Sequence, residues 1–306
     1  MVPTLSRVRA SARSHRGDAV VTGGGSGIGR ALCTELARRE CRVVVADVDE
    51  VAARATVETV QSAGGSAHPV RCDVSRLDDV EALARAAEQW FGGPPTLVVN
   101  NAGIGTGGQL IGETRVPDWE RTIAVNLWGV IHGCQVFVPA MRAAGRGGVI
   151  NVASAASFGL APRMAAYNVS KAGVLALSET LAAELSGTGV TVSVVCPTFV
   201  RTNIIHSEAI DAALLPLAEK AMARFGWDPP RVASVCLDAH DRGRLHVLPQ
   251  LDARLMWLVK RLAPATFTRA IGRLGRLAPS GPPVSSPAGR EPAEVGSGSP
   301  SSALPR

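Results

Sequence analysis

Short valine-rich runs alternate with longer segments of helical period between about residue 17 and residue 250. This alternation is typical of βαβ units, in which helices cover both faces of a parallel sheet. The strands are expected at DAVVT, CRVVVAD, HPVRCDV, TLVVNNAG, GGVINVAS, GVTVSVVCP and RLHVLP. Helices are expected to begin at about Gly27, Asp49, Arg76, Val116, Pro162 and Pro229. The sequence therefore predicts one doubly wound α/β domain with a mostly seven-stranded parallel sheet.

Both ends of the 306-residue chain differ in composition from this domain. Residues 1–16 are basic and contain no acidic residue, and we expect a disordered N-terminal extension there. Residues 278–306 are rich in Pro, Ser and Gly, a composition that buries too little apolar surface to fold, and we expect a disordered tail. The folded part is expected to comprise a domain over 17–250 and basic amphipathic helices over 251–277.

Charge, cysteine content and hydropathy exclude several classes of protein. The net charge is +6, but inside the domain the charges are interspersed and form no basic stripe, which argues against a nucleic-acid partner. The six cysteines form no CxxC pair and no metal-ligand spacing, so buried thiols in a reducing compartment are expected, with no metal. No apolar run approaches the roughly 18 residues of a membrane span. We therefore expect a cytoplasmic protein.

A glycine-rich loop, TGGGSGIGR from Thr22 to Arg30, follows the first expected strand and precedes a helix. Glycines there let the backbone turn sharply and approach a pyrophosphate held by the N–H groups of the helix. Its spacing, Gly23-x-x-x-Gly27-x-Gly29, differs from the general G-x-G-x-x-G pattern. Its place between strand and helix nevertheless indicates a Rossmann-type dinucleotide site.

Asp47 ends the second expected strand, eighteen residues after Gly29. An acid at roughly this offset accepts hydrogen bonds from the adenosine ribose hydroxyls and repels a 2′-phosphate, which favours NAD over NADP. Asp47 could instead be a solvated loop acid at the start of the next helix. Asp73, at the end of the third strand, allows the same two interpretations, and its strand-end position favours adenine contact.

Tyr167 and Lys171 stand one helical turn apart in YNVSK. Tyr167 is the only tyrosine, and Lys171 is one of three lysines. Residues four apart share a helix face, and a nearby cation lowers the pKa of a phenol, so we expect Tyr167 to act as an acid/base near neutral pH. The plain alternative is a packing aromatic beside a surface charge.

With TGxxxGIG, the NNAG of Asn100 to Gly103 and YNVSK in order, residues 17–250 resemble the short-chain dehydrogenase/reductase family. The resemblance implies a catalytic group of Asn126, Ser154, Tyr167 and Lys171. Tyr167 would take the hydroxyl proton, Ser154 would hold the substrate oxygen, and Asn126 would hold a water that links Lys171 to solvent. The implied cofactor-binding residues are Gly23, Gly25, Ser26, Gly27, Ile28, Gly29, Asp47, Asp73, Val74, Asn100, Ala102, Gly103, Tyr167, Lys171, Pro197, Val200 and Thr202.

The family's P-G-x-x-x-T segment appears here as PTFVRT, so Pro197 and Thr202 match while Thr198 stands where glycine is usual. This departure raises the question of how the backbone passes the nicotinamide face.

A substrate pocket is expected around Ala155, Ala156, Phe158, Leu160 and Met164, with a lid after Thr202. These apolar residues favour a lipophilic alcohol or ketone of steroid, retinoid, long-chain or polyketide type, although core packing explains them too. Two further functions stay open: an NADPH-dependent carbonyl reductase, which Asp47 disfavours, and a dinucleotide-sensing protein without catalysis, which the complete catalytic group disfavours.

Residues 251–277 contain one acid, six basic residues and an apolar stripe. Such helices can lie on an anionic membrane surface, cover the lid or pack on another subunit, and the sequence leaves all three open. The resemblance also implies a homodimer or homotetramer formed through the helices from Val116 and Pro162.

Overall fold

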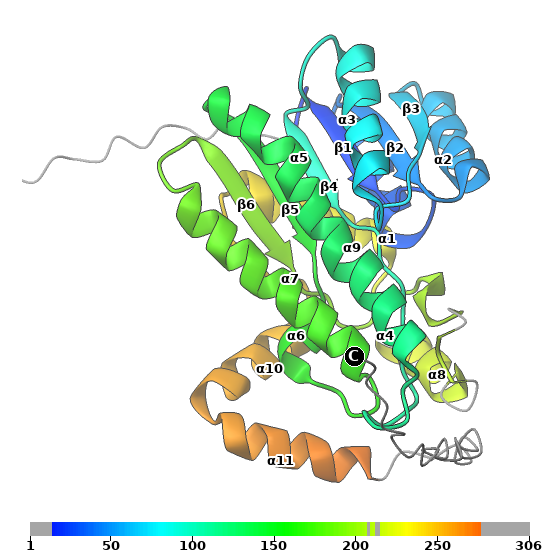
Figure 1. Ribbon diagram of the computed structural model, residues 1–306, viewed down its shortest axis with the longest axis vertical. Helices are drawn as coiled ribbons and strands as arrows, with labels where there is room; N and C mark the ends of the chain where they lie inside the picture. The colour runs from blue at the N-terminus through cyan, green and yellow to red at the C-terminus, as the bar shows by residue number, and fades with distance from the viewer. Residues whose placement is uncertain (1–13, 207–208, 212–214, 277–306) are drawn as a thin grey trace, which may run out of the picture.

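The computed structural model describes residues 14–206, 209–211 and 215–276. Its sheet has seven parallel strands in the order β3-β2-β1-β4-β5-β6-β7 (Figure 1). The strands are β1 (Asp18–Thr22), β2 (Arg42–Asp47), β3 (Ser66–Arg71), β4 (Leu97–Asn100), β5 (Gly147–Val152), β6 (Val190–Val195) and β7 (His246–Val247). The doubly wound α/β fold predicted from the sequence is confirmed.

Helices cover both faces of this sheet, because successive residues of each strand point to opposite sides. Their bounds are α1 (Gly27–Arg38), α2 (Glu50–Ser62), α3 (Leu77–Phe91), α4 (Val116–Ile123), η1 (Ala124–Trp128), α5 (Gly129–Ala143), α6 (Ala156–Gly159), α7 (Ala165–Glu184), η2 (Asn203–His206), α8 (Leu215–Phe225), α9 (Pro229–Asp241), α10 (Leu251–Leu262) and α11 (Pro264–Gly275). Val20 and Val98 pack with α3, α5 and α7, whereas Val21 and Val99 pack with α1, α2 and α9. Each face therefore has its own apolar core.

The chain order places a functional site at the carboxyl ends of the strands. β1 continues through α1 to β2 on one side, while β4 lies on the other side of β1. The crevice at such a switch in direction is where open α/β sheets bind ligands. A ligand site is therefore expected at the carboxyl ends of β1, β2, β4 and β5.

Several boundaries differ from the sequence prediction. The helix expected from Pro162 begins at Ala165, because Leu160 and Arg163 adopt left-handed backbone angles (φ 51° and 63°) that a helix cannot include. The third strand begins at Ser66, two residues before HPVRCDV, and the last strand shortens to His246–Val247.

The residues just before β1 belong to the fold. Ser14 is fully buried, and its N–H and hydroxyl both donate to the Asp241 carboxylate at the end of α9. The expected extension over 1–16 is therefore wrong for residues 14–16, and its residues 1–13 lie outside the described residues. The expected tail over 278–306 lies outside them as well.

The helix that runs from Val116 to Ala143 is long and apolar enough to cross a membrane by length and composition, with a mean hydropathy of 1.4. The expectation from the sequence that no apolar run approaches the length of a membrane span is wrong for this helix. In the fold α4 and α5 pack against α7, α3 and β5, as a core helix of a globular domain does. Length and composition alone are therefore weak evidence for a span.

Candidate active site

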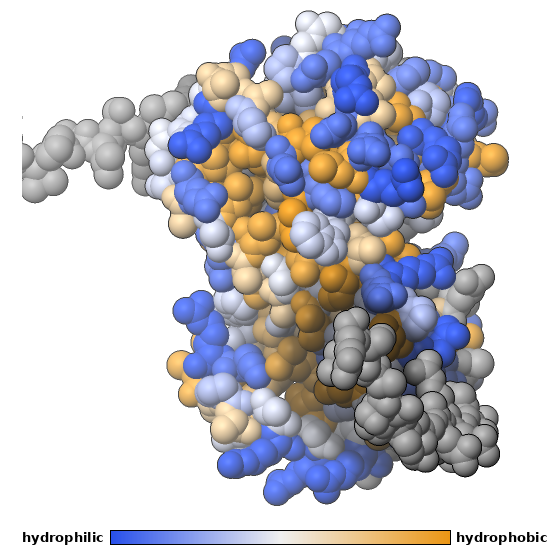
Figure 2. All heavy atoms as spheres, viewed as in Figure 1, coloured by the Kyte–Doolittle hydropathy of each residue, from blue (hydrophilic) through white to orange (hydrophobic). Residues whose placement is uncertain are grey.

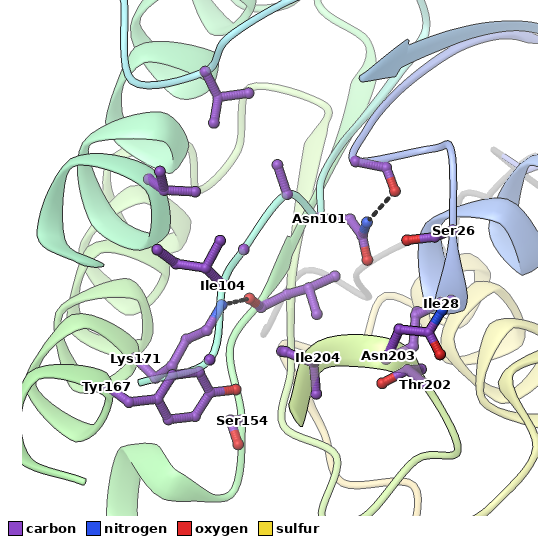
Figure 3. A pocket seen from close by; sticks show the side chains of 18 of the residues that line it. Ser26, Ile28, Asn101, Ile104, Ser154, Tyr167, Lys171, Thr202, Asn203 and Ile204 are labelled. Atoms are coloured by element: carbon purple, nitrogen blue, oxygen red, sulfur yellow. Dashed lines mark hydrogen bonds between the residues drawn. The ribbon is translucent and has the colours of Figure 1, made fainter. Parts of the chain in front are cut away.

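A cavity of about 750 Å³ opens at the carboxyl ends of the central strands. Figure 3 shows Ser154, Tyr167 and Lys171 grouped on one side, with Ser26, Ile28 and Thr202 on the opposite side. The sequence-predicted residues that line it are Gly23, Ser26, Gly27, Ile28, Asp47, Asp73, Val74, Ala102, Gly103, Ser154, Tyr167, Lys171, Pro197, Val200 and Thr202. Four predicted residues, Gly25, Gly29, Asn100 and Asn126, lie behind this lining.

The glycine loop packs too closely for side chains. A Cβ atom on Gly29 would lie 2.0 Å from the carbonyl oxygen of Gly23, and one on Gly23 would lie 2.7 Å from Ala102 Cα. Asn101 completes the loop, because its Nδ2 donates to the carbonyls of Thr22 (2.9 Å) and Gly23 (3.1 Å). The sequence reasoning missed Asn101, although it lies inside the NNAG motif. The loop thus turns into α1 with its backbone against the cavity.

Asp47 ends β2 with its carboxylate at the cavity. Its Oδ2 accepts from the Gly25 N–H (2.8 Å), and its Oδ1 accepts from the Asp49 N–H (3.0 Å). The alternative of a capping acid applies to Asp49, whose Oδ1 accepts from the Ala52 N–H at the start of α2 (3.1 Å). A carboxylate has about four lone-pair sites, so Asp47 keeps acceptor capacity beyond these two bonds.

Asp73 and Val74 form the next part of the wall. Asp73 Oδ1 accepts from the N–H and hydroxyl of Ser75 (3.0 and 2.7 Å), which fixes the turn after β3. The Val74 carbonyl bonds with His132 Nδ1 on α5 (2.9 Å). These bonds hold the wall where β3 ends.

Asn100 has no direct access to the cavity. It is buried, and its Nδ2 donates to Asn151 Oδ1 (2.8 Å), which joins β4 to β5 inside the sheet. The structure thus places Asn100 where it can steady the central strands.

Tyr167 and Lys171 lie one turn apart on α7, as predicted from their spacing. Both are buried, and Lys171 Nζ lies 5.9 Å from the centre of the Tyr167 ring. Lys171 Nζ donates to the carbonyl of Val152 at the end of β5 (2.9 Å). Ser154, two residues beyond Val152, lines the same cavity as Tyr167 and Lys171. The end of β5 and the first turns of α7 therefore bring the three side chains together.

Burial governs the pKa values of this group. Burial raises the pKa of Tyr167 above its usual range, and the nearby Ser154 side chain opposes that rise. Burial lowers the pKa of Lys171 to about 8. The expectation that Lys171 brings the Tyr167 pKa down toward neutrality is therefore wrong for the protein alone, because removal from water disfavours the charged form of both groups.

Asn126 lies within η1, a single turn of π-helix between α4 and α5. Its Oδ1 accepts from the Ile104 N–H (2.8 Å), and its Nδ2 donates to the Ile104 carbonyl (3.0 Å) and to Ser170 Oγ (3.2 Å). A Cβ atom on Gly103 would lie 3.2 Å from Asn126 Oδ1 and 3.3 Å from Lys171 Nζ. Asn126 therefore positions the strand-end loop beside Lys171.

The segment after β6 forms the remaining wall. Pro197, Thr198, Val200 and Thr202 line the cavity, and a Cβ atom on Gly27 would lie 3.0 Å from the Thr202 methyl group. Thr198 has no left-handed φ, so its backbone does not require the glycine that is usual at this position.

The substrate side of the cavity differs from the expected set. Ala155, Ala156, Phe158, Leu160 and Met164 are absent from the lining, and Phe158 packs on Trp257 instead. The lining there includes Ile104, Gly105, Arg121, Asn203, Ile204 and Met222. Ile104, Gly105 and Arg121 come from the loop after β4 and from α4, where no sequence motif marks them. Asn203, Ile204 and Met222 come from η2 and α8, within the segment after Thr202 where the lid was expected.

Comparison with known proteins identifies the family. Residues 18–212 match the short chain dehydrogenase family. The chain belongs to the short-chain dehydrogenase/reductase family. Its fold and site geometry agree with this membership.

Two curated relatives illustrate the similarity. A protein of Mycobacterium tuberculosis named "Probable oxidoreductase EphD" is 35% identical over 287 residues, which is 89% of this chain and 48% of that protein. The chain thus spans about half the length of the curated relatives it matches first. The 3-oxoacyl-[acyl-carrier-protein] reductase FabG of Staphylococcus aureus is 31% identical over 74% of this chain and 92% of its own length.

A solved structure shows the same fold. The crystal structure of a short-chain dehydrogenase/reductase from Burkholderia phymatum in complex with NAD superposes with a TM-score of 0.75. It is 33% identical and covers 89% of this chain and 99% of its own.

The residues of this cavity fit a nicotinamide dinucleotide. Gly23 and Gly29 have no side chain, so the loop backbone is not screened by a Cβ atom at these positions. Helix α1 begins at the cavity, and the Asp47 carboxylate lies beside the loop. Helix N-termini bind phosphates, and a carboxylate binds ribose hydroxyls. The family membership and this geometry therefore agree on the cofactor class.

Proposed function

We propose that this chain transfers a hydride between NAD and a carbon that bears a hydroxyl or carbonyl group on a lipophilic substrate. The observation that carries the proposal is one cavity that is lined both by Asp47, at the end of β2, and by Ser154, Tyr167 and Lys171, which follow β5 or lie on α7. The strands β2 and β5 are separated by β1 and β4 in the sheet, which leaves room for an extended dinucleotide between the two groups.

The reaction would use the three buried side chains in distinct roles. NAD supplies the nicotinamide carbon that accepts or gives the hydride. Ser154 Oγ would hold the substrate oxygen, and the Tyr167 hydroxyl would take the proton from an alcohol or return it to a ketone. Lys171 has three N–H donors, and its bond to Val152 uses one, so donors remain for ribose hydroxyls. Its charge would stabilise the phenolate as the proton leaves.

The expected water relay takes a modified form. Both polar atoms of the Asn126 side chain already bond to Ile104, so we assign Asn126 to positioning the wall beside Lys171. A water held near Gly103 would reach both Asn126 and Lys171, whose atoms lie on either side of the space above that glycine.

We propose NAD rather than NADP because Asp47 would repel a 2′-phosphate. Both oxygens of Asp47 are fixed by N–H groups, so the carboxylate cannot turn away without losing these bonds. A preference for NADP in steady-state kinetics would contradict this assignment.

A lipophilic substrate is supported by Ile104, Ile204 and Met222 in the wall near the catalytic group. The expected classes remain steroid, retinoid, long-chain and polyketide compounds. A panel of such alcohols, assayed beside small polyols, tests the class. Turnover restricted to polyols would refute it.

An NADPH-dependent carbonyl reductase is the second candidate. The resemblance to the S. aureus reductase favours reduction as the direction. Asp47 opposes NADPH, so a ketone panel assayed with both reduced cofactors separates the two proposals.

We also propose that α10 contacts anionic lipid surfaces of a cytoplasmic membrane. Leu251, Leu255, Leu258 and Leu262 recur at spacings of four, three and four residues, and each is at least half exposed. Exposed Arg254 and Arg261 flank this stripe, so a second copy of α10 would bring like charges together, whereas an anionic membrane would attract them.

Flotation with vesicles tests this contact. The full chain should float with phosphatidylglycerol vesicles and remain behind with phosphatidylcholine, and Leu255→Gln with Leu258→Gln should abolish flotation. Equal behaviour of the variant and the original chain would refute the proposal.

A homo-oligomer through α5 and α7 is proposed from the surface of that face. Figure 2 shows apolar side chains gathered over these two helices, and Trp128 and Val169 are each 51% exposed. Sedimentation should show a dimer or tetramer that Val169→Glu dissociates. A monomer at all concentrations would contradict the proposal.

A further inference from the structure

Gln250 precedes α10 and uses its side chain in an unusual way. It is the N-cap residue of that helix, where a side chain ordinarily accepts from the helix's own N–H groups, yet it makes no such bond. Instead its Oε1 accepts from the Thr198 N–H (3.2 Å), and its Nε2 donates to the Phe199 carbonyl (3.1 Å). The side chain is buried, with 3% of the residue exposed. One amide therefore pairs with the backbone on both sides of the Thr198–Phe199 peptide.

A second tie joins the same two segments. The Thr198 hydroxyl donates to Asp252 Oδ1 in the first turn of α10 (3.2 Å). Glycine, which is usual at position 198 in the family, could not make this bond. Threonine at position 198, where glycine is usual, therefore provides a hydrogen bond to α10.

The segment that Gln250 holds is a wall of the cavity. Pro197, Thr198 and Val200 line it, and the Pro197 carbonyl accepts from the N–H of Ala155, the residue after Ser154 (2.9 Å). From the opposite direction the Trp227 N–H also donates to the Phe199 carbonyl (3.0 Å). With Gln250 removed, the Thr198 N–H would lose its bond and the Phe199 carbonyl would keep one donor of two, so the wall could move toward or away from the cavity.

The C-terminal helices lie beyond residues 18–212, where the family match ends. They nevertheless also contact α6, the short helix that follows β5, through Trp257 against Phe158 (ring centres 5.1 Å apart). The helix that begins at Gln250 thus contacts both segments that frame the catalytic group.

Resting on the proposed function, we propose that Gln250 is a positioning residue that sets the 197–202 wall against the nicotinamide half of NAD. It acts through the Thr198–Phe199 backbone and touches no reacting atom. Its effect is therefore confined to ligands that carry the nicotinamide ring and to the hydride-transfer step.

Two ligands separate this role from general stability. NADH binding is measured by fluorescence, and binding of ADP-ribose, which lacks the nicotinamide base, is measured by calorimetry. Gln250→Ala should weaken NADH binding about tenfold and lower kcat by a similar factor, while ADP-ribose affinity stays unchanged. Gln250→Glu keeps an acceptor for Thr198 but sets a carboxylate oxygen against the Phe199 carbonyl oxygen, so a loss at least as large as that of Gln250→Ala is expected.

Gln61→Ala is the matched control. The Gln61 side chain donates to the Ala67 carbonyl (3.2 Å) between α2 and β3, away from the nicotinamide wall. This variant should bind both ligands as the original chain does.

Each result decides something. Unchanged NADH affinity in both Gln250 variants would overturn the inference while the proposed function stands. Equal weakening of NADH and ADP-ribose would show a general structural role and would also overturn it. If the original chain bound neither ligand, the proposed function itself would fail, and this inference with it.

Discussion

Asp47 shows how a single residue can serve both structure and specificity. Its carboxylate accepts from the Gly25 and Asp49 N–H groups, so it stabilises the glycine loop and the turn into α2. The same carboxylate lines the cavity. The sequence supplied its position, but only the structure shows that two backbone bonds fix its orientation.

Asp47→Ser should raise the KM for NAD about tenfold and increase the relative use of NADP, because the ribose acceptor and the repelling charge are both removed. Steady-state kinetics with the two cofactors measures this. Asp49→Ala is the control: it should lower the free energy of unfolding by about 1 kcal/mol through the lost cap and leave the cofactor ratio unchanged. A shifted ratio in the control, or an unshifted one in Asp47→Ser, would contradict the assignment.

At the scale of elements, the π-turn η1 shapes the site. If the α-helix continued without interruption from Val116 to Ala143, the side chains beyond Ala124 would point in other directions around the helix axis. With the wider π-turn, the Asn126 side chain faces Ile104. No residue in AVNLW signals a π-turn, so the sequence could predict the helix and the role of Asn126 in the family without predicting this local geometry.

Asn126→Ala should lower the free energy of unfolding by about 1–3 kcal/mol, because the Ile104 N–H and carbonyl lose their partners. It should also reduce kcat, since the loop beside Lys171 is released. Urea unfolding and steady-state kinetics measure the two effects. A variant that is stable and fully active would show that η1 needs no such anchor.

At the scale of the molecule, the two apolar layers enclose all six cysteines as free, buried thiols. Burial raises the pKa of Cys134 from 9.0 to about 11 and those of Cys72, Cys196 and Cys236 to about 12. A raised pKa in the fold means that the stabilising contribution is complete below pH 9. It is lost as pH rises toward 11 or 12, because only the unfolded chain ionises in that window.

The free energy of unfolding should therefore fall from pH 8 to pH 10 by about 1 kcal/mol for each such thiol. The advantage of the original chain over Cys236→Ala should shrink over the same interval. Urea unfolding at the two pH values tests this. A constant difference between the two chains would contradict the burial of this thiol.

Patterning along the chain predicted most of the fold and of the site, because strand ends, glycine spacing and the Tyr167–Lys171 turn are local features. Contacts between segments that are distant in the sequence could not be predicted from this patterning. The expected loop residues from Ala155 to Met164 are absent from the lining, and Ile104 and Arg121, which no motif marks, are present in it. The pKa of Tyr167 likewise depends on burial by many segments, which a spacing of four residues does not contain.

The most direct test of the central claim follows absorbance at 340 nm with purified protein, NAD and a panel of lipophilic alcohols, with Tyr167→Phe in parallel. We expect NADH formation by the original chain, its near-complete loss in Tyr167→Phe, and unchanged NADH binding by both. NADH formation that persists in Tyr167→Phe would contradict the assignment of Tyr167 as the group that moves the proton.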